Sequence, residues 1–270
     1  MSPAGPEERR PGIVMDLDGT VWVGRQMIAG ALDCLRWLKR AGFPLVYLTN
    51  NPVRPESYAS RLTEHGLPTD PDEVMTASTI LKDHLMEVMP RARLFVLSDP
   101  DVRAQFEPDF AFSEDPFAID VVIATSPMTL DNTGLTIAFR ALRRGALFVA
   151  TNADPSWVSP EGVEVPHAAA VIGALEASAK RSVELVAGKP SRLAAERVQR
   201  RLDRRPEEIL VVGDNLDTDV RFARQNGMLS VLVLTGVGRR DEAEAAPHPP
   251  DYILDSIAEL PALLHARSEA

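Results

Sequence analysis

Two aspartates stand two residues apart directly after a short apolar run. Asp16 and Asp18 follow Ile13-Val14-Met15, and Gly19 comes next. Alternate side chains of an extended segment share a face, and a glycine permits a tight turn or the close approach of an oxyanion to the backbone. This arrangement indicates phosphoryl chemistry, although short Asp-x-Asp strings are also common in solvated turns. The pair alone leaves both interpretations open.

Three further polar loops could complete such a site. Thr49-Asn50-Asn51 offers a hydroxyl and two amides that can donate hydrogen bonds to phosphate oxygens. Lys189, before a proline and a predicted helix start, would add a positive charge. The segment 213–219 follows an apolar run and carries three carboxylates, which favours a hard-cation site. Taken singly, these loops could be a capping turn, a surface lysine and an acidic turn.

The elements that must position these loops follow an α/β pattern. Short apolar runs lie at 13–15, 45–48, 94–97, 121–124, 147–150, 184–187, 209–212 and 230–234. Helical periodicity appears at about 30–40, 55–65, 79–89, 135–143, 167–180 and 191–202. In the first of these helices, Leu32, Leu35 and Leu38 are predicted to form one stripe. Because ligands collect beyond the carboxyl ends of the strands in an open parallel sheet, the four polar loops are predicted to meet there.

The middle of the chain is predicted to be an insertion. Residues 78–182 have predicted strands and helices of their own. Two of the four polar loops precede this segment in the chain and two follow it. We therefore predict a doubly wound parallel-sheet core of residues 12–77 and 183–265, interrupted by an α/β cap domain of residues 78–182. Residues 1–11, rich in Pro, Glu and Arg, are predicted to be a disordered tail.

Composition excludes several classes of partner. The 270 residues include 29 Lys plus Arg against 39 Asp plus Glu, and the net charge of -10 would repel a nucleic acid. No apolar stretch resembles a signal peptide or is long enough to span a bilayer, so we expect a cytoplasmic protein with no membrane partner. The single cysteine, Cys34, allows no intramolecular disulfide and is expected to be a small buried thiol.

The joint pattern is more specific than any one loop. Transfer of a phosphoryl group to a carboxylate requires positive charge, because the nucleophile and the dianionic ester repel each other. Mg²⁺, which prefers oxygen ligands, and Lys189 would supply this charge, and Asp16 and Asp214 suit the ion. Two neighbouring carboxylates can also divide roles, one staying ionised near the metal while the other holds a proton for the leaving group.

With its four loops in this order, the chain resembles the haloacid dehalogenase (HAD) superfamily of phosphohydrolases. Residues 16–20 look like its first motif, Thr49 its second, Lys189 its third, and Asp214 with Asp219 its fourth. The long insertion is similar to the C2-type α/β cap of the NagD-like, or para-nitrophenyl phosphatase, branch. The resemblance spans the whole predicted core.

The resemblance implies a role for each matching residue. Asp16 would attack phosphorus and form an aspartyl-phosphate, and Asp18 would protonate the leaving alcohol and then activate water. Mg²⁺ would be held by Asp16, the backbone carbonyl of Asp18 and Asp214, with Asp219 behind these ligands. The phosphoryl oxygens would be held by Thr49, Asn50, Asn51 and Lys189.

The cap departs from the branch in two places. The segment from Thr125 to Leu135 lacks the Gly-x-Asp and the following aromatic residue that are associated with the branch. Relatives often carry a Pro-Gly-x-Gly turn where this chain has Pro166-His167-Ala168-Ala169. His167 is most simply a helix-start residue, with a substrate contact as the alternative. Asp154, Trp157 and Arg54 are further candidate substrate contacts, each weighed against a plain structural role.

The predicted function is that of a Mg²⁺-dependent phosphatase acting on a small phosphorylated metabolite, such as a sugar, polyol or related phosphomonoester. A cap that closes over the substrate would exclude bulk water and macromolecules. The alternatives are a phosphotransferase on the same fold and a non-catalytic sensor of phosphate esters. Dehalogenation is disfavoured because it needs neither Asp18 nor the acidic fourth loop. A homodimer formed through the cap is one assembly that this organisation allows.

Overall fold

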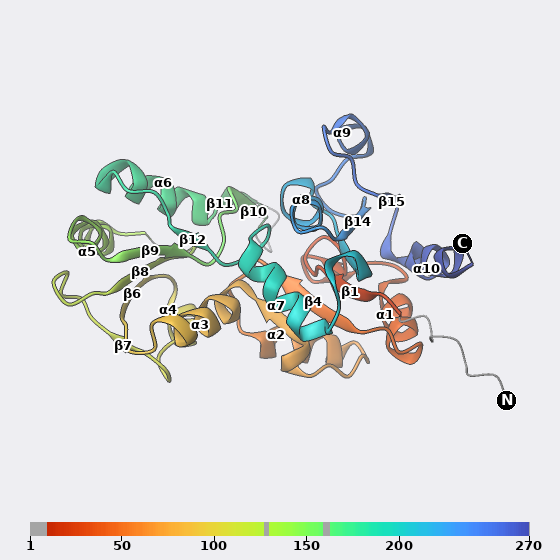
Figure 1. Ribbon diagram of the computed structural model, residues 1–270, viewed down its shortest axis with the longest axis horizontal. Helices are drawn as coiled ribbons and strands as arrows, with labels where there is room; N and C mark the ends of the chain where they lie inside the picture. Colours follow the sequence, from red (N-terminus) through yellow and green to blue (C-terminus); the bar gives the residue numbers. More distant parts are fainter. Residues whose placement is uncertain (1–9, 127–129, 159–162, 270) are drawn as a thin grey trace. The chain divides into compact units, whose positions relative to one another are not determined.

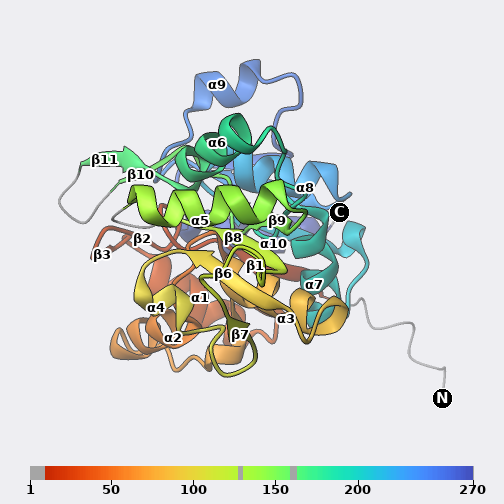
Figure 2. The same cartoon turned by 90° about the vertical axis from the view of Figure 1, so that its left-hand side faces the viewer.

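The computed structural model describes residues 10–126, 130–158 and 163–269, in which helices and strands alternate (Figure 1 and Figure 2). Most of the predicted tail, residues 1–9, lies outside the described part. The chain divides into two compact units. The first unit comprises Met1–Leu48, Thr63–Pro68 and Ala195–Ala270, and the second unit comprises Thr49–Leu62 and Thr69–Ala194.

The first unit is built on parallel strands in the order β15-β14-β13-β1-β4. Their bounds are Gly12–Met15 (β1), Leu45–Thr49 (β4), Ile209–Gly213 (β13), Leu229–Val233 (β14) and Tyr252–Leu254 (β15). The central strand β1 is fully buried, and its register places Met15 opposite Val212 and Tyr47. Since parallel strands end at the same edge, Asp16 and Asp214 leave the sheet side by side. An antiparallel hairpin of Trp22–Val23 (β2) and Gln26–Met27 (β3) follows Asp16.

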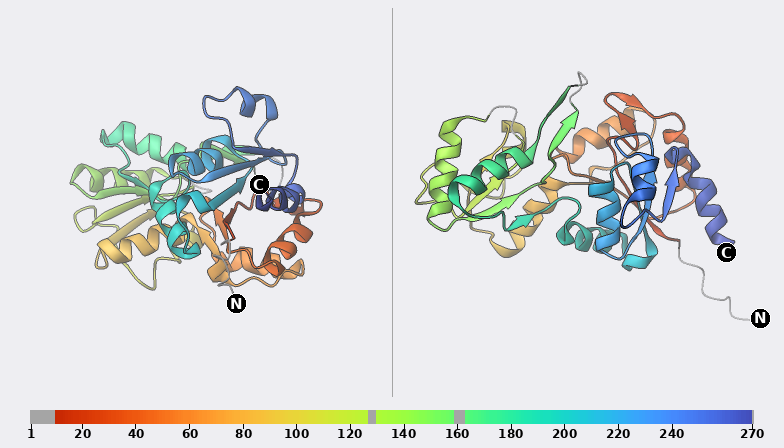
Figure 3. Two further views of the ribbon diagram at one scale, coloured as in Figure 1. Left: turned by 45° about the vertical axis from the view of Figure 1, so that its right-hand side comes forward. Right: turned by 90° about the horizontal axis from the view of Figure 1, so that it is seen from above.

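Helices cover both faces of this sheet. In the right panel of Figure 3, α1 (red-orange) and α10 (dark blue) lie on one face and α8 (light blue) on the other. The helices and short turns are α1 (Ala31–Arg40), α8 (Arg221–Gln225), α9 (Arg240–Ala245), α10 (Leu260–Ser268), the 3₁₀ turns η2 (Pro206–Glu208) and η4 (Ile257–Glu259), and the π-turn η3 (Leu216–Val220). Two more helices, α2 (Pro55–Glu64) and α7 (Arg192–Leu202), cross the division between the units.

Helix α1 corrects one detail of the sequence pattern. Its buried stripe consists of Ala31, Cys34, Leu35 and Leu38, the i, i+3, i+4, i+7 spacing of one helix face. Leu32 is only half-buried, so its predicted place on the stripe was wrong. Cys34 is buried as predicted, and burial raises the pKa of its thiol to about 12.

The second unit has its own parallel sheet, in the order β12-β9-β8-β6-β7. Helices α5 and α6 lie side by side on one face, and α3 and α4 lie on the other (Figure 2). The elements of this unit are η1 (Pro71–Glu73), β5 (Val74–Thr76), α3 (Ala77–Val88), β6 (Arg93–Leu97), α4 (Pro100–Arg103), β7 (Ala111–Phe112), β8 (Val121–Ala124), α5 (Asn132–Arg143), β9 (Leu147–Ala150), the antiparallel pair β10 (Ser156–Val158) and β11 (Glu164–Pro166), α6 (Ala168–Ala179) and β12 (Leu185–Val186). Side chains from α5 and α6 pack on β8 and β9 to form its core.

The predicted α/β class and parallel sheets are confirmed, and every predicted apolar run overlaps a strand. The division into units differs from the predicted boundaries of 12–77 with 183–265 and of 78–182. Strand β12 pairs with β9. Residues 183–194, which were predicted to begin the second segment of the core, therefore belong to the second unit. Within the described ranges, no helix has the length and apolar character needed to cross a bilayer.

Candidate active site

Three carboxylates come together in the first unit. Asp16, Asp214 and Asp219 are buried, and each has an oxygen within 4.8 Å of an oxygen of the other two. Burying like charges this closely is unfavourable without a compensating cation. In the part of the chain that the structure describes, this is the one group of three or more acidic, His or Cys side chains spaced to bind a metal ion. The three oxygens suit a hard divalent cation.

The two carboxylates that follow β1 and β13 are oriented by neighbouring groups. The backbone N–H of Asp16 donates to the Val212 carbonyl at 2.9 Å, which extends the β1–β13 ladder into the loop. Thr20 Oγ1 donates to Asp16 Oδ2 at 3.1 Å, and the backbone N–H of Val237 donates to Asp214 Oδ2 at 2.8 Å. Thr20 lies in the predicted first loop but was given no role there, and Val237 lies outside all four predicted loops.

Asp219 reaches the cluster from the π-turn η3. The backbone N–H of Asn215 donates to Asp219 Oδ2 at 3.1 Å. A Cβ on Gly213 would lie 2.1 Å from the Asp219 carboxyl carbon, so only glycine leaves room for this side chain. Asp217, the third acid of the loop, is exposed and is not a member of the group.

Two glycines make room for the Asp214 carboxylate. A Cβ would lie 2.4 Å from Asp214 Oδ2 if built on Gly19 and 1.9 Å if built on Gly236. Gly19 also has a φ of +91°, which side-chain-bearing residues rarely adopt. Thr235 Oγ1 donates to the Gly19 carbonyl at 2.6 Å and joins the two loops. Gly236 and Gly238 lie in that loop shortly after the apolar run 230–234, but nothing in this local pattern indicates which acid the loop faces.

Asp18 differs from Asp16 in its environment. It is exposed, and the indole Nε1–H of fully buried Trp22 donates to its Oδ1 at 2.8 Å. The backbone N–H of Gly19 donates to the Trp22 carbonyl at 2.7 Å, which closes the turn. An indole N–H can only donate, so Oδ1 accepts and a proton carried by Asp18 belongs on Oδ2. Trp22 lies four residues after Asp18, and that spacing was the available signal for this contact.

The second unit contains the predicted phosphate-binding residues. Thr49, at the end of β4, and Lys189 are each 3% exposed. Thr49 Oγ1 accepts a hydrogen bond from the backbone N–H of Asn51 at 3.0 Å. Asn51 Oδ1 in turn accepts from the backbone N–H of Val53 at 3.3 Å. The Thr49-Asn50-Asn51 loop is therefore ordered by its own polar groups.

Asn50 links this loop to two others within the second unit. Its Nδ2 donates to both carboxylate oxygens of Asp154, at 3.3 and 3.1 Å, and to the Lys189 carbonyl at 2.9 Å. An amide nitrogen has two hydrogens, and these contacts occupy both of them. A phosphate contact from Asn50 would therefore come from its backbone N–H, not from its side-chain NH₂ group.

Asn152 joins the same network, and its contact determines which ring nitrogen of His167 carries the hydrogen. Its fully buried side chain donates from Nδ2 to Asp154 Oδ2 at 2.5 Å and lies 2.9 Å from His167 Nδ1. Nδ1 must accept this bond, so His167 carries its hydrogen on Nε2 and is neutral. Burial lowers the pKa of His167, and the negative charge of Asp154 opposes that shift.

The other candidate contacts lie near this network or on the surface of the unit. His167 precedes the first residue of α6, as predicted for a helix-start residue, and its backbone N–H donates to the Pro155 carbonyl at 3.0 Å. The half-buried ring of Trp157 meets the His167 ring edge-on, with 6.3 Å between centroids. Arg54 is exposed just before α2.

Lowering the pH should destabilise the protein through His167. Its folded pKa lies below the ordinary value of 6.5, so the unfolded chain binds this proton first as the pH falls. The stability that neutral His167 contributes is present above pH 6.5 and is lost below it, toward the lowered folded pKa. Urea unfolding between pH 7.5 and 5 should show a smaller loss for His167→Gln than for wild type. The exposed His248→Gln variant should match wild type, and equal pH slopes in all three proteins would contradict this assignment.

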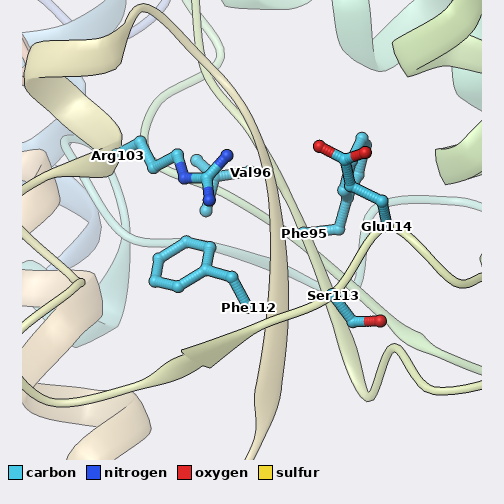
Figure 4. A pocket seen from close by; sticks show the side chains of 6 residues that line it. All are labelled: Phe95, Val96, Arg103, Phe112, Ser113 and Glu114. Carbon is cyan, nitrogen blue, oxygen red and sulfur yellow. The ribbon is translucent and has the colours of Figure 1, made fainter.

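A separate pocket lies at the β7 edge of the second sheet (Figure 4). Six residues line it: Phe95, Val96, Arg103, Phe112, Ser113 and Glu114. The Arg103 guanidinium carbon is 4.7 Å from the centroid of the Phe112 ring, a cation–π contact within the pocket wall. None of these six residues belongs to the predicted site.

Comparison with known proteins gives the family. A model described as haloacid dehalogenase-like hydrolase matches residues 13–108, and one described as HAD-hydrolase-like matches residues 186–260. Sugar-phosphatase AraL of Bacillus subtilis (strain 168) is 32% identical over 251 residues, which cover 92% of this chain and 91% of that protein. The chain belongs to the haloacid dehalogenase-like hydrolases. The predicted family is thus confirmed.

Solved structures place this HAD hydrolase on the NagD-like branch. The 4-nitrophenylphosphatase of Thermotoga maritima is 31% identical with a TM-score of 0.87, covering 93% of this chain and 96% of that one. NagD from Escherichia coli K-12 is 25% identical with a TM-score of 0.84, covering 93% and 98%. The predicted core with a cap domain is confirmed, and the chain is a hydrolase of the HAD phosphomonoesterase type.

Proposed function

We propose that this hydrolase is a Mg²⁺-dependent phosphatase that cleaves a small phosphorylated metabolite through an aspartyl-phosphate. The observation that carries this proposal is the buried group of Asp16, Asp214 and Asp219, in which the first acid directly follows β1. Three oxygen ligands suit Mg²⁺, which tolerates few ligands other than oxygen. When bound, the ion supplies positive charge that offsets the repulsion between a carboxylate nucleophile and a phosphate ester.

In the first step, a carboxylate oxygen of Asp16 attacks phosphorus and the bond from phosphorus to the ester oxygen breaks. The hydrogen bond from Thr20 holds the Asp16 carboxylate in one orientation for this attack. The departing oxygen takes a proton from Asp18, whose carboxyl group is exposed and therefore accessible to a leaving group. The products are an aspartyl-phosphate on Asp16 and a free alcohol.

In the second step, water attacks the phosphorus of the aspartyl-phosphate and gives its proton to Asp18. The bond from phosphorus to the Asp16 oxygen breaks, which releases inorganic phosphate and restores both carboxyl groups to their initial states. Because Trp22 donates to Oδ1 of Asp18, we propose that Oδ2 carries the proton in both steps. Asp16 therefore acts as the nucleophile and Asp18 as the general acid and base, in keeping with the burial of Asp16 and the exposure of Asp18.

The phosphoryl oxygens are proposed to bind Thr49, the backbone N–H groups of Asn50 and Asn51, and Lys189. Thr49 is the last residue of β4, and β4 pairs with β1, the strand that Asp16 follows. Lys189 is buried, and a buried ammonium requires a negatively charged or polar partner. Its charge would stabilise the phosphoryl group as it transfers.

The proposed substrate is a sugar phosphate or a related small phosphate ester. Relatives along nearly the whole chain bear the names sugar-phosphatase in Bacillus subtilis and acid sugar phosphatase in Staphylococcus aureus. The polar groups Arg54 and His167 and the ring of Trp157 are proposed to contact the organic part of the substrate. A cytoplasmic location and a homodimer through the cap stay predictions.

Removing the indole N–H next to Asp18 should lower kcat by different factors for different phosphate esters. Trp22→Phe keeps an aromatic ring but leaves Asp18 Oδ1 without its donor, so proton delivery should be less well aligned. We expect kcat to fall about tenfold for an alkyl phosphate, the size of one hydrogen bond to a charged group. The fall should be smaller for 4-nitrophenyl phosphate, whose leaving group needs little help from an acid. Equal losses for both esters would indicate general destabilisation and contradict the positioning role of Trp22.

The function is tested by measuring inorganic phosphate released from a panel of esters. The panel should contain sugar phosphates, polyol phosphates, nucleotides and pyridoxal phosphate, with Mg²⁺ present or removed by a chelator. We expect release that depends on Mg²⁺ and favours sugar or polyol phosphates. Undiminished turnover after chelation would contradict the metal role. Transfer to an added alcohol in place of water would identify a phosphotransferase.

A further inference from the structure

The carboxylate of Asp154 is the meeting point of two side-chain amides. Asn50 donates to both of its oxygens, at 3.3 and 3.1 Å, and Asn152 donates to Oδ2 at 2.5 Å. Asp154 lies on the loop after β9, 104 residues from Asn50 in the chain. An ionised carboxylate can only accept hydrogen bonds, so it matches two converging NH₂ groups.

The network continues from Asn50 to the lysine loop. The second hydrogen of the Asn50 amide goes to the Lys189 carbonyl at 2.9 Å. The backbone N–H of Gly188 donates to the Thr151 carbonyl at 2.7 Å, so this loop is also tied to the Asp154 loop. A Cβ on Gly188 would lie 2.4 Å from Asn50 Oδ1, which shows how closely the segments approach. Three loops, at 49–51, 151–154 and 188–190, are thereby held at fixed spacings.

A direct contact between Asp154 and the substrate phosphate is disfavoured by charge. A carboxylate beside a phosphate dianion is repelled, and the repulsion grows in a partly desolvated site. The lone pairs of Asp154 that face the two amides are already used. Its charge is better matched to the amide donors of Asn50 and Asn152 than to a substrate anion.

We propose that Asp154 is a positioning residue for phosphate binding. It orients the Asn50 amide, and Asn50 in turn holds the Lys189 backbone at a fixed distance from the Thr49-Asn50-Asn51 loop. The groups proposed to bind the phosphoryl oxygens are thus set in place before the substrate arrives. This inference rests on the proposed function and adds to it a residue that acts without touching the substrate.

A double-mutant cycle tests whether Asp154 acts through Asn50. Asp154→Asn has nearly the same shape but presents an NH₂ group to an amide donor, and Asn50→Ala removes that donor. We expect each single variant to raise the KM of a sugar phosphate and the inhibition constant of inorganic phosphate together, by about tenfold. The double variant should be no worse than the poorer single one, because both changes break the same link. The Mg²⁺ concentration for half-maximal activation should stay at the wild-type value.

Controls separate this role from loss of structure and from loss of the function itself. Asp101→Asn, an exposed aspartate on α4 of the same unit, should behave as wild type. If Asp154→Asn does not fold, Asp154→Ser enters the same cycle. Additive losses, or a fall in kcat with unchanged phosphate inhibition, would overturn the positioning role. A wild-type protein that neither releases nor binds phosphate would instead remove the proposed function, before any variant is compared.

Discussion

Asp16→Asn should abolish phosphate release while leaving the fold intact. An amide cannot attack phosphorus as a carboxylate does, and the other two acids of the cluster are proposed to be occupied with the metal, so kcat should fall on the order of 10⁴-fold or more. The substitution is isosteric, and the Thr20 hydroxyl can still donate to the amide oxygen. Acid quenching with a ³²P-labelled ester should trap a phosphoenzyme in wild type and none in the variant.

The control for Asp16→Asn is the same substitution at an aspartate outside the cluster. Asp33→Asn alters an exposed aspartate on α1, so it should retain the phosphoenzyme and the wild-type rate. Asp18→Asn should differ from both variants, because it keeps the nucleophile but slows proton transfer, most severely for esters with poor leaving groups. Wild-type activity in Asp16→Asn would contradict the nucleophile assignment directly.

Asp214→Asn should separate metal binding from folding. With one of three buried charges neutralised, the affinity for Mg²⁺ should fall about 100-fold, so half-maximal activation should need correspondingly more of the ion. In the absence of metal, the variant should unfold at the wild-type temperature or above it, because repulsion within the cluster is reduced. Added Mg²⁺ should raise the Tm of wild type but not of the variant, since only wild type binds it tightly.

The matched control lies three residues away in the same loop. Asp217→Asn removes an equal charge from an exposed side chain outside the cluster, so its activation by Mg²⁺ and its Tm shift should match wild type. A wild-type Tm that does not respond to Mg²⁺, or equal responses in the Asp214 and Asp217 variants, would contradict the proposed metal site.

The regular elements were largely predictable because their signals are local. Strands such as β1, β8 and β13 are buried along their whole length, so they are nearly continuous apolar runs in the sequence. Strands β7 and β15 and helix α9 were missed, since two to six residues are too few to show a periodic pattern. The place of β12 depended on its pairing with β9, which is a non-local contact.

The candidate site was predictable in its acidic and loop residues but not in the groups that hold them. Asp16 and Asp214 each follow a buried strand, and parallel strands bring such residues to one edge. The donor that Val237 offers to Asp214 comes from a loop more than 20 residues away, and no local pattern marks it. The link from Asn50 to Asp154 spans 104 residues and is equally invisible in the sequence.

The sequence by itself determined the α/β class, the family and the acids available for chemistry, because strand burial and loop composition are properties of neighbouring residues. Only the tertiary structure decided how those groups are held. It placed the indole of Trp22 on one oxygen of Asp18, and it committed the Asn50 amide to Asp154 and Lys189. These are hydrogen bonds made by side chains, and their geometry depends on the packed fold and not on residue type alone.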